Sequence, residues 1–219
     1  MTFTRADLVA AAVSRRAALL GTAAALLVGH AGHATLAALD GSPKDFIQRI
    51  GDQAVSILNT AGATPPQKLK QLKSLLDQST DLDLVARLVL GRYWRDGTDA
   101  QKQEYVRLFH QLVMQTMAER FSWYTGETFE IIDAKPVDDR DTMVSTRIVR
   151  PNGKPPILVD WRVRRSERGY LLIDIVAEGV SLVVTQRSEA AEYISRNGFD
   201  GLLQEMKERV AKRETLEGT

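Results

Sequence analysis

The chain contains no cysteine among its 219 residues and only three histidines. The lack of cysteine excludes disulfide bonds, thiolate zinc sites, cysteine nucleophiles and iron–sulfur clusters. His30 and His33 lie in or beside a segment that we interpret below as an export signal, which leaves His110 in the mature protein. One histidine cannot build a multi-histidine metal centre, so we expect no metal and no other cofactor.

The common catalytic motifs are also absent: there is no GxSxG elbow, phosphate-binding glycine loop, HExxH pair or dinucleotide fingerprint. His110 is one position off an apolar helical stripe and is interpreted as a surface or boundary residue. Asp160 and Asp174 are the best remaining candidates for acid–base chemistry. They alternate away from the apolar side of their strands, near Arg162 and Arg164, which favours solvated ion pairs between strands. We therefore expect a protein that is not an enzyme.

The formal net charge is +1, and no dense basic stripe with interleaved aromatic residues occurs. Removal of residues 1–34 would leave 26 basic and 27 acidic residues. The mature protein is thus close to neutral, and nucleic-acid binding is not expected.

The N-terminus has the pattern of an export signal. Ser14-Arg15-Arg16 precedes an uncharged run from Ala17 to Val28, and small-residue sites follow, ending at Ala31 or Ala34. Twelve helical residues span about 18 Å, which is short of the roughly 30 Å hydrocarbon core and disfavours the alternative of an uncleaved anchor. The paired arginines resemble a twin-arginine signal. We expect residues 1–34 to direct export to the periplasm, residues 35–213 to form one domain, and residues 214–219 to be a tail.

The first half of the mature chain reads as helical. Helix starts are predicted at Ser42-Pro43, at Thr64-Pro65-Pro66-Gln67 and at Thr98-Asp99-Ala100-Gln101, each with a capping residue. The helix that begins near Asp99 carries a broad apolar face at steps of three and four residues, which continues to Tyr124.

After Gly126 the hydrophobic period changes from 3.6 to 2. Four strands are predicted, at residues 128–134, 142–149, 157–165 and 170–177, with turns at residues 151–153 and 167–169. Val144 and Ile148, then Ile157, Val159, Trp161 and Val163, then Leu171, Ile173 and Ile175 would form one apolar face. That face must be covered by helices, and two closing helices are predicted at residues 187–197 and 200–212. The sequence therefore predicts an α+β fold.

Ordered motifs from about Leu84 to Met206 resemble the MlaC family, the periplasmic proteins of an ABC-type lipid transport system that include the toluene-tolerance proteins. The motifs are Leu90-Gly91-Arg92-Tyr93-Trp94-Arg95, Thr98-Asp99-Ala100-Gln101 with Tyr105 and Phe109, Tyr124-Thr125-Gly126-Glu127, Pro151-Asn152-Gly153-Lys154-Pro155-Pro156, Asp160-Trp161-Arg162, Asp174 to Leu182, and Asn197-Gly198-Phe199-Asp200-Gly201-Leu202. Ala190 stands where the family usually has an aromatic residue, and Tyr170 where tryptophan is common. The segment Thr185-Gln186-Arg187-Ser188-Glu189 also resembles a hopanoid-associated branch of the family, HpnM.

The resemblance implies an NTF2-like α+β fold, in which N-terminal helices pack on a curved antiparallel sheet and enclose an apolar cavity for phospholipid tails. It implies docking to an inner-membrane ABC transporter, through its substrate-binding subunit, and to an outer-membrane lipoprotein complex. A hopanoid is the alternative ligand. Two further alternatives are an NTF2-like enzyme, which needs an acidic or basic side chain inside the cone formed by the sheet and helices, and a non-lipid interaction subunit with a solid core.

We expect the apolar sheet face, the facing side of the long helix and the segment after Glu178-Gly179 to line the lipid site. The expected lining residues are Phe109, Val113, Met117 and Phe121 from the helix, Val144, Ile148, Val159, Trp161, Ile173 and Ile175 from the sheet, and Val180 and Leu182 at the mouth.

Overall fold

The protein was analysed as a computed structural model, which describes residues 41–121, 124–151 and 153–217. The chain divides into two units, Met1–Leu39 and Asp40–Thr219, and every described residue belongs to the second. The predicted export signal, with Arg15, Arg16 and His30, lies outside the described residues.

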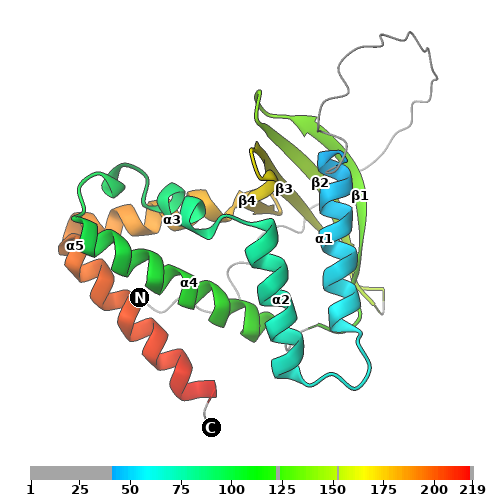
Figure 1. Ribbon diagram of the computed structural model, residues 1–219, viewed down its shortest axis with the longest axis horizontal. Coiled ribbons are helices and arrows are strands. Elements are labelled where there is room, and N and C mark those ends of the chain that lie inside the picture. The colour runs from blue at the N-terminus through cyan, green and yellow to red at the C-terminus, as the bar shows by residue number, and fades with distance from the viewer. Residues whose placement is uncertain (1–40, 122–123, 152, 218–219) are drawn as a thin grey trace. The chain divides into compact units, whose positions relative to one another are not determined.

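The described chain alternates between helices and one antiparallel sheet (Figure 1). The helices are α1 (Pro43–Leu58), α2 (Pro65–Ser79), α3 (Leu82–Leu90), the short 3₁₀ helix η2 (Gly91–Trp94), α4 (Asp99–Phe121) and α5 (Leu182–Glu217). The strands are β1 (Thr128–Pro136), β2 (Asp141–Val149), β3 (Ile157–Ser166), β4 (Gly169–Ala177) and β5 (Val180–Ser181). They pair in chain order, which confirms the α+β fold and adds a two-residue fifth strand to the four predicted.

The three predicted helix starts carry the expected caps. At α1, the backbone N–H of Asp45 donates to Ser42 Oγ over 3.2 Å, and the Asp45 carboxylate accepts from the Ser42 N–H over 2.8 Å. Thr64 with Gln67 and Thr98 with Gln101 repeat this reciprocal arrangement. These bonds satisfy N–H groups that the first helical turn leaves unpaired.

Two helix boundaries differ from the predictions. Helix α4 ends at Phe121, and Tyr124 lies outside it. Helix α5 begins at Leu182, five residues before the predicted start at Arg187, because Ser181 caps it directly after β5. The two predicted closing helices are consecutive parts of α5, separated by a kink at Gly198, whose φ of 71° favours glycine.

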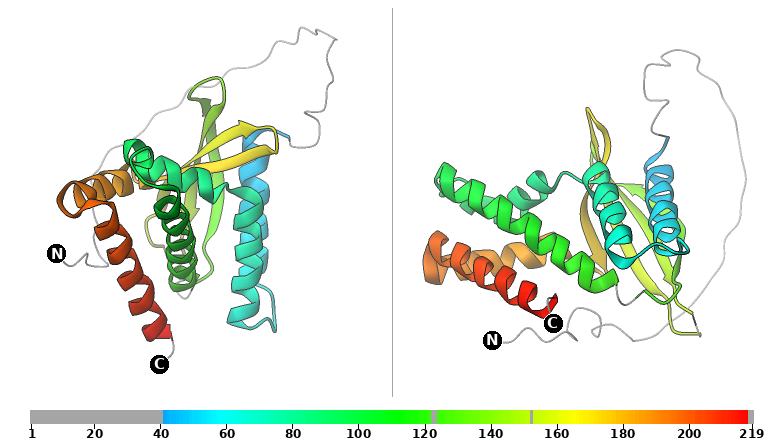
Figure 2. Two further views of the ribbon diagram at one scale, coloured as in Figure 1. Left: turned by 60° about the vertical axis from the view of Figure 1, so that its left-hand side comes forward. Right: turned by 60° about the horizontal axis from the view of Figure 1, so that its bottom comes forward.

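The buried apolar side chains form two separate cores. The helical core joins α3, α4 and α5 around Tyr105, Leu108 and Met206. The sheet core joins α1, through Phe46 and Ile47, to strands β2, β3 and β4. In the right-hand view of Figure 2, α3, α4 and α5 lie to the left of the sheet, whereas α1 and α2 lie together in front of it. Helix α2 contacts α1, α4 and β4, so it stands between the two cores.

The contact of α1 with the sheet depends on a glycine. A Cβ atom added at Gly51 would lie 2.0 Å from Cζ of the Phe129 ring in β1. This distance is far below any van der Waals contact, so only glycine lets the helix backbone rest directly on that ring. Gly51 therefore fixes how closely α1 covers the sheet.

The sheet contains two irregularities that sequence alternation did not predict. The register shifts in β1 between Ile131 and Asp133, and in β4 beside Ile173. As a result Leu172, rather than Leu171, pairs with Val163 on the apolar face. The prediction that Leu171 and Ile173 continue the face of Ile175 was wrong, because one extra residue in a strand inverts the alternation beyond it.

Candidate functional site

The sheet has one apolar and one polar face. Residues that pair between antiparallel strands point to the same side, so the register assigns each face. The apolar face carries Phe129, Ile131 and Ala134 from β1, Val144, Thr146 and Ile148 from β2, Ile157, Val159, Trp161 and Val163 from β3, and Leu172, Ile175 and Ala177 from β4. The polar face carries Arg147, Asp160, Arg162, Arg164 and Asp174 among others.

A buried carboxylate organises the polar face. Asp141 has no exposed surface, and its oxygens accept hydrogen bonds from Arg164 Nε over 2.7 Å and from Arg162 Nε over 2.8 Å. The hydrogen bond from Arg164 is the main cause that lowers the pKa of Asp141, and Arg162 lowers it further. Arg162 and Arg164 thus pair with Asp141, not with the expected Asp160 or Asp174.

Asp174 has a structural role at the start of α5. Its carboxylate accepts hydrogen bonds from Ser181 Oγ over 2.6 Å and from the Val183 N–H over 3.1 Å. Ser181 Oγ in turn accepts from the Val184 N–H at the start of α5. Asp174 therefore holds the positive end of α5 against the sheet. It points toward a helix terminus and not into an apolar cavity, which is where an NTF2-like enzyme would need its acid or base.

Helix α1 covers only part of the apolar face. Phe46, near its start, packs on Tyr170 at the beginning of β4, with ring centroids 6.0 Å apart. Gly51, one and a half turns later, lies on Phe129 at the beginning of β1. Because the sheet is antiparallel, these two points lie at opposite ends of it. The helix therefore crosses the face diagonally and leaves one corner outside the sheet core.

We call this region the apolar corner and define it by the apolar-face residues at the end of β2, the start of β3, the end of β4 and β5. Its members are Ile148, Ile157, Val159, Ile175, Ala177 and Val180, of which Ile175 also packs against the sheet core. Val159 is buried, Val180 is 47% exposed, and the other four are half-buried. Aliphatic side chains of this size would normally be buried further inside a well-packed core.

Further half-buried apolar residues outside both cores occur on α2 and α4. In α4 they include Val113 and Met117, and in α2 they are Leu69, Leu72 and Leu76. None of the five belongs to either core. The α2 leucines were not among the predicted site residues, although their spacing of three and four residues is visible in the sequence.

Trp161 is held in place beside the apolar corner. Its indole N–H donates to Thr146 Oγ1 over 2.8 Å, and the Thr146 hydroxyl donates to the Val159 carbonyl oxygen over 2.9 Å. Thr146 is completely buried, whereas Trp161 is half-buried. Both polar groups are satisfied, so this part of the face presents hydrocarbon without an open hydrogen-bonding group.

The other predicted lining residues fall into distinct places. Val144 and Ile173 are fully packed, at 0% and 3% exposure, and Phe109 packs on the helical core. Leu182 is half-buried at the first position of α5. The side chain of Phe121 lies outside the described residues. Helix α1, rather than the expected α4, makes the direct contacts with β1 and β2.

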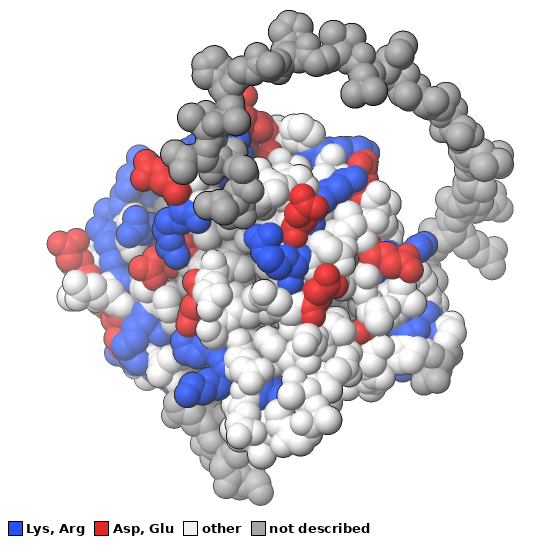
Figure 3. Space-filling view, turned by 45° about the vertical axis from the view of Figure 1, so that its right-hand side comes forward, with Lys and Arg blue, Asp and Glu red and all other residues white. Residues whose placement is uncertain are grey.

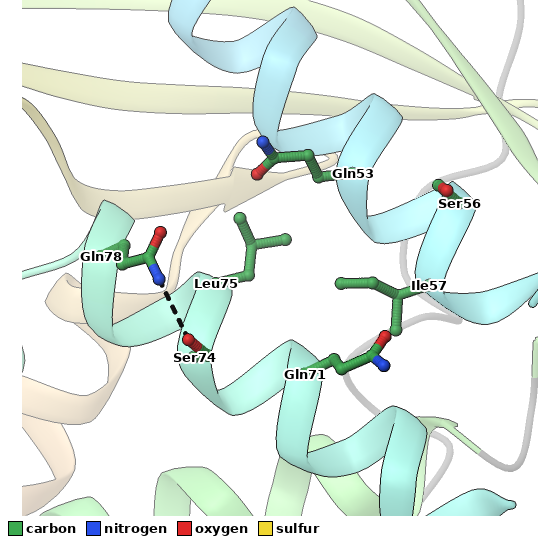
Figure 4. Close-up of a pocket in the computed structure, with 7 residues that line it drawn as sticks. All are labelled: Gln53, Ser56, Ile57, Gln71, Ser74, Leu75 and Gln78. Carbon is green, nitrogen blue, oxygen red and sulfur yellow. Dashed lines mark hydrogen bonds between the residues drawn. The ribbon is translucent and has the colours of Figure 1, made fainter. Parts of the chain in front are cut away.

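A solvent-open groove of about 300 Å³ lies between α1 and α2 (Figure 4). Gln53, Ser56 and Ile57 of α1 and Gln71, Ser74, Leu75 and Gln78 of α2 line it. Five of these seven residues carry an amide or a hydroxyl group, whereas the members of the apolar corner carry none. The fifteen residues 53–67 carry no charge. The face in Figure 3 likewise has a broad uncharged lower area, and charges of both signs are mixed above it.

Several motif residues that resemble the MlaC family hold the helical core together. The Arg187 Nε donates to the Leu88 carbonyl oxygen over 2.7 Å, and its side chain passes Gly91 closely. A Cβ atom at Gly97 would lie 2.7 Å from the Phe199 ring, which also packs edge-on to Tyr105. These residues build the scaffold and do not line the apolar corner.

The described residues contain no group of three or more histidine, cysteine or acidic residues placed to hold a metal ion. In the same part of the chain, no helix is both long and apolar enough to cross a membrane. His110 is half-buried, and its Nε2 lies 2.9 Å from the Asp83 carboxylate, as suits a residue at the boundary between core and surface.

The described chain is an α+β domain, in which an antiparallel sheet has one partly covered apolar face and the flanking helices add half-buried leucine, valine and methionine. The chain matches the MlaC protein family over residues 48–208, and it belongs to that family. It is 21% identical over 178 residues to the intermembrane phospholipid transport system binding protein MlaC of Haemophilus influenzae, covering 78% of this chain and 83% of the relative.

A solved structure shares this fold. The phospholipid-binding protein of Ralstonia solanacearum, determined in complex with a phospholipid, superposes with a TM-score of 0.67 at 25% sequence identity. The match covers 78% of this chain and 97% of the other. The predicted membership of the MlaC family is thus confirmed.

Proposed function

We propose that the protein is a soluble periplasmic carrier that binds phospholipid and shuttles it between the outer and inner membranes together with an ABC-type transport system. Its family and the names of its two relatives, both of which refer to phospholipid, support lipid binding. The proposed partners are the transporter's substrate-binding subunit at the inner membrane and a lipoprotein complex at the outer membrane. No cofactor and no catalytic residue enter this function.

The observation that carries the proposal is the set of half-buried apolar side chains that lie outside both cores. Ile148 and Ile157 on the sheet, Leu72 and Leu76 on α2, and Met117 on α4 are large enough to be core residues, yet none belongs to either core. Acyl chains placed among them would complete their burial. Side chains of α2 and α4 and the apolar corner are therefore the proposed lining.

The energetics fit a carrier of this kind. Two acyl chains of roughly thirty methylenes represent on the order of 20 kcal/mol of apolar transfer free energy, at about 0.8 kcal/mol for each methylene. A protein must offer hydrocarbon contacts on that scale to remove the chains from a bilayer. Since the tails supply the affinity, the head group can remain in water and no charged site residue is needed.

The proposal is tested by placing a charge in the apolar corner. In Ile148→Asp a carboxylate would have to be desolvated against acyl chains, at a cost of several kcal/mol. We expect the phospholipid that co-purifies with the mature protein, quantified after solvent extraction, to fall more than tenfold.

Leu158→Asp is the matched control, because Leu158 pairs with Arg147 on the polar face and is already 51% exposed. Its lipid content should stay within about twofold of the wild-type value. Circular dichroism and the unfolding midpoint establish that both variants fold. A folded Ile148→Asp protein with a full lipid load would contradict the proposed site.

A hopanoid is the second candidate ligand, because residues 185–189 resemble the hopanoid-associated branch of the family. The same extraction separates the two ligands, since mass spectrometry distinguishes a diacyl phospholipid from a polycyclic hydrocarbon.

A further inference from the structure

We infer that Thr146 is a positioning residue of the lipid site, which fixes the Trp161 indole so that the ring forms a rigid wall for acyl chains. The inference rests on the proposed function, because it assigns Trp161 a place against the ligand. It concerns a pair of side chains and a hydrogen-bond relay that the lipid-binding proposal itself does not require.

The relay runs across two strands. Thr146 in β2 pairs directly with Val159 in β3, and its hydroxyl donates to the Val159 carbonyl oxygen over 2.9 Å. That bond uses the hydroxyl hydrogen and leaves the oxygen free to accept. The Trp161 indole N–H then donates to the oxygen over 2.8 Å. The direction of each bond is therefore set by the fixed backbone acceptor at its end.

The geometry also fixes where the ring lies. Trp161 pairs with Val144, so Thr146 is its diagonal neighbour on the same face, one pair closer to the apolar corner. A diagonal neighbour on an antiparallel pair is within reach of a long aromatic side chain. Because the indole N–H donates to Thr146, the ring is directed away from Val144 in the sheet core and toward Ile148 and Ile157 in the apolar corner.

A structural role alone would not need this pair. A phenylalanine or leucine could fill the sheet core at position 161, and a valine could fill position 146, without placing two polar groups in an apolar face. The threonine is completely buried, whereas the tryptophan packs against the sheet core and stays half-buried, so all the exposed surface of the pair belongs to Trp161. A ring locked in one orientation loses no rotamer freedom when a ligand binds, which favours slow ligand release.

The test compares Thr146→Val with Thr146→Ser. Valine keeps the volume and removes both hydrogen bonds, whereas serine keeps the hydroxyl. Loss of one such bond corresponds to about a fivefold change in an equilibrium or rate constant. With phosphatidylglycerol carrying a fluorescent acyl chain as the probe, transfer from the protein to acceptor vesicles should be about five times faster for Thr146→Val and near the wild-type rate for Thr146→Ser.

Two readouts separate positioning from general destabilisation. The indole N–H resonance of Trp161, assigned by its loss in Trp161→Phe, should shift in Thr146→Val and return in Thr146→Ser. In the Trp161→Phe background, Thr146→Val should no longer accelerate transfer, because its effect acts through the indole. An unchanged transfer rate in Thr146→Val, or an equal acceleration with phenylalanine at position 161, would overturn the inference. A wild-type protein that binds no probe, with the indole shift still present, would instead refute the proposed function.

Discussion

The close contact between Gly51 and the Phe129 ring predicts that Gly51→Ala destabilises the wild-type protein but stabilises a variant that lacks the ring. In the wild-type protein, Gly51→Ala places a methyl carbon where the ring atom Cζ lies 2.0 Å away. The half-buried Phe129 ring can make room only by rotating away from its rotamer or by shifting with its strand. We expect overpacking to cost about 1–3 kcal/mol. The higher helix propensity of alanine opposes this by about 0.5–1 kcal/mol, so the net loss of unfolding free energy should be about 1–2 kcal/mol.

In the Phe129→Ala background the ring is absent and the obstacle is removed. Gly51→Ala should then stabilise the protein by about 0.5–1 kcal/mol, the ordinary gain for glycine to alanine within a helix. Urea unfolding followed by circular dichroism measures all four proteins of the cycle. Equal effects of Gly51→Ala in the two backgrounds would refute the contact and, with it, the diagonal path of α1 across the sheet.

Two further predictions concern the scaffold. The guanidinium groups of Arg164 and Arg162 hold the pKa of Asp141 below its ordinary value of 3.8. Its contribution to stability should therefore be complete above about pH 4 and be lost as the pH falls through the lower folded-state pKa. Urea unfolding between pH 7 and pH 3 measures this contribution. Asp141→Asn should lower the unfolding free energy by about 2–3 kcal/mol at pH 7 and make it fall less steeply as the pH is lowered. Asp138→Asn should change neither the unfolding free energy at pH 7 nor its pH dependence. Arg187→Met removes the hydrogen bond to the Leu88 carbonyl at the end of α3 and should cost about 1 kcal/mol. The same change at Arg196, an exposed residue of α5, should stay within about 0.5 kcal/mol, and equal losses at both positions would contradict the assigned role of Arg187.

Local patterns predicted most of the elements. The capping residues Ser42, Thr64 and Thr98 act within one helical turn, so their sequence signature is nearly independent of the rest of the fold. The alternation at residues 142–149 and 157–165 likewise identified β2, β3 and their shared apolar face. These predictions held because each depends on neighbours a few residues away.

Predictions that depended on distant parts of the chain were less successful. The register shift beside Ile173 has no local signature, and it moved Leu172 to the apolar face in place of Leu171. The covering helix was expected to be α4, the longest apolar pattern, but much of that pattern is used to build the helical core with α5. The leucines of α2 were overlooked because a regular amphipathic stripe does not reveal which surface it will meet.

The assignment of residues to the lipid site remains a prediction, and the strand register shows which of these residues share the apolar corner. Ile148, Val159, Ile175 and Val180 lie together in the apolar corner, whereas Val144 and Phe109 belong to the two packed cores. The difference lies in which side chains pack together in a core, which depends on how the helices cover the sheet and could not be derived from alternation alone.

Native mass spectrometry tests the central claim most directly. The mature protein would be purified from its own periplasm without detergent, weighed intact, and then extracted with solvent for lipid identification. We predict one mass that exceeds the polypeptide by a stoichiometric lipid, with diacyl phospholipid in the extract. A lipid-free mass, together with failure to take up added phospholipid, would contradict lipid carriage.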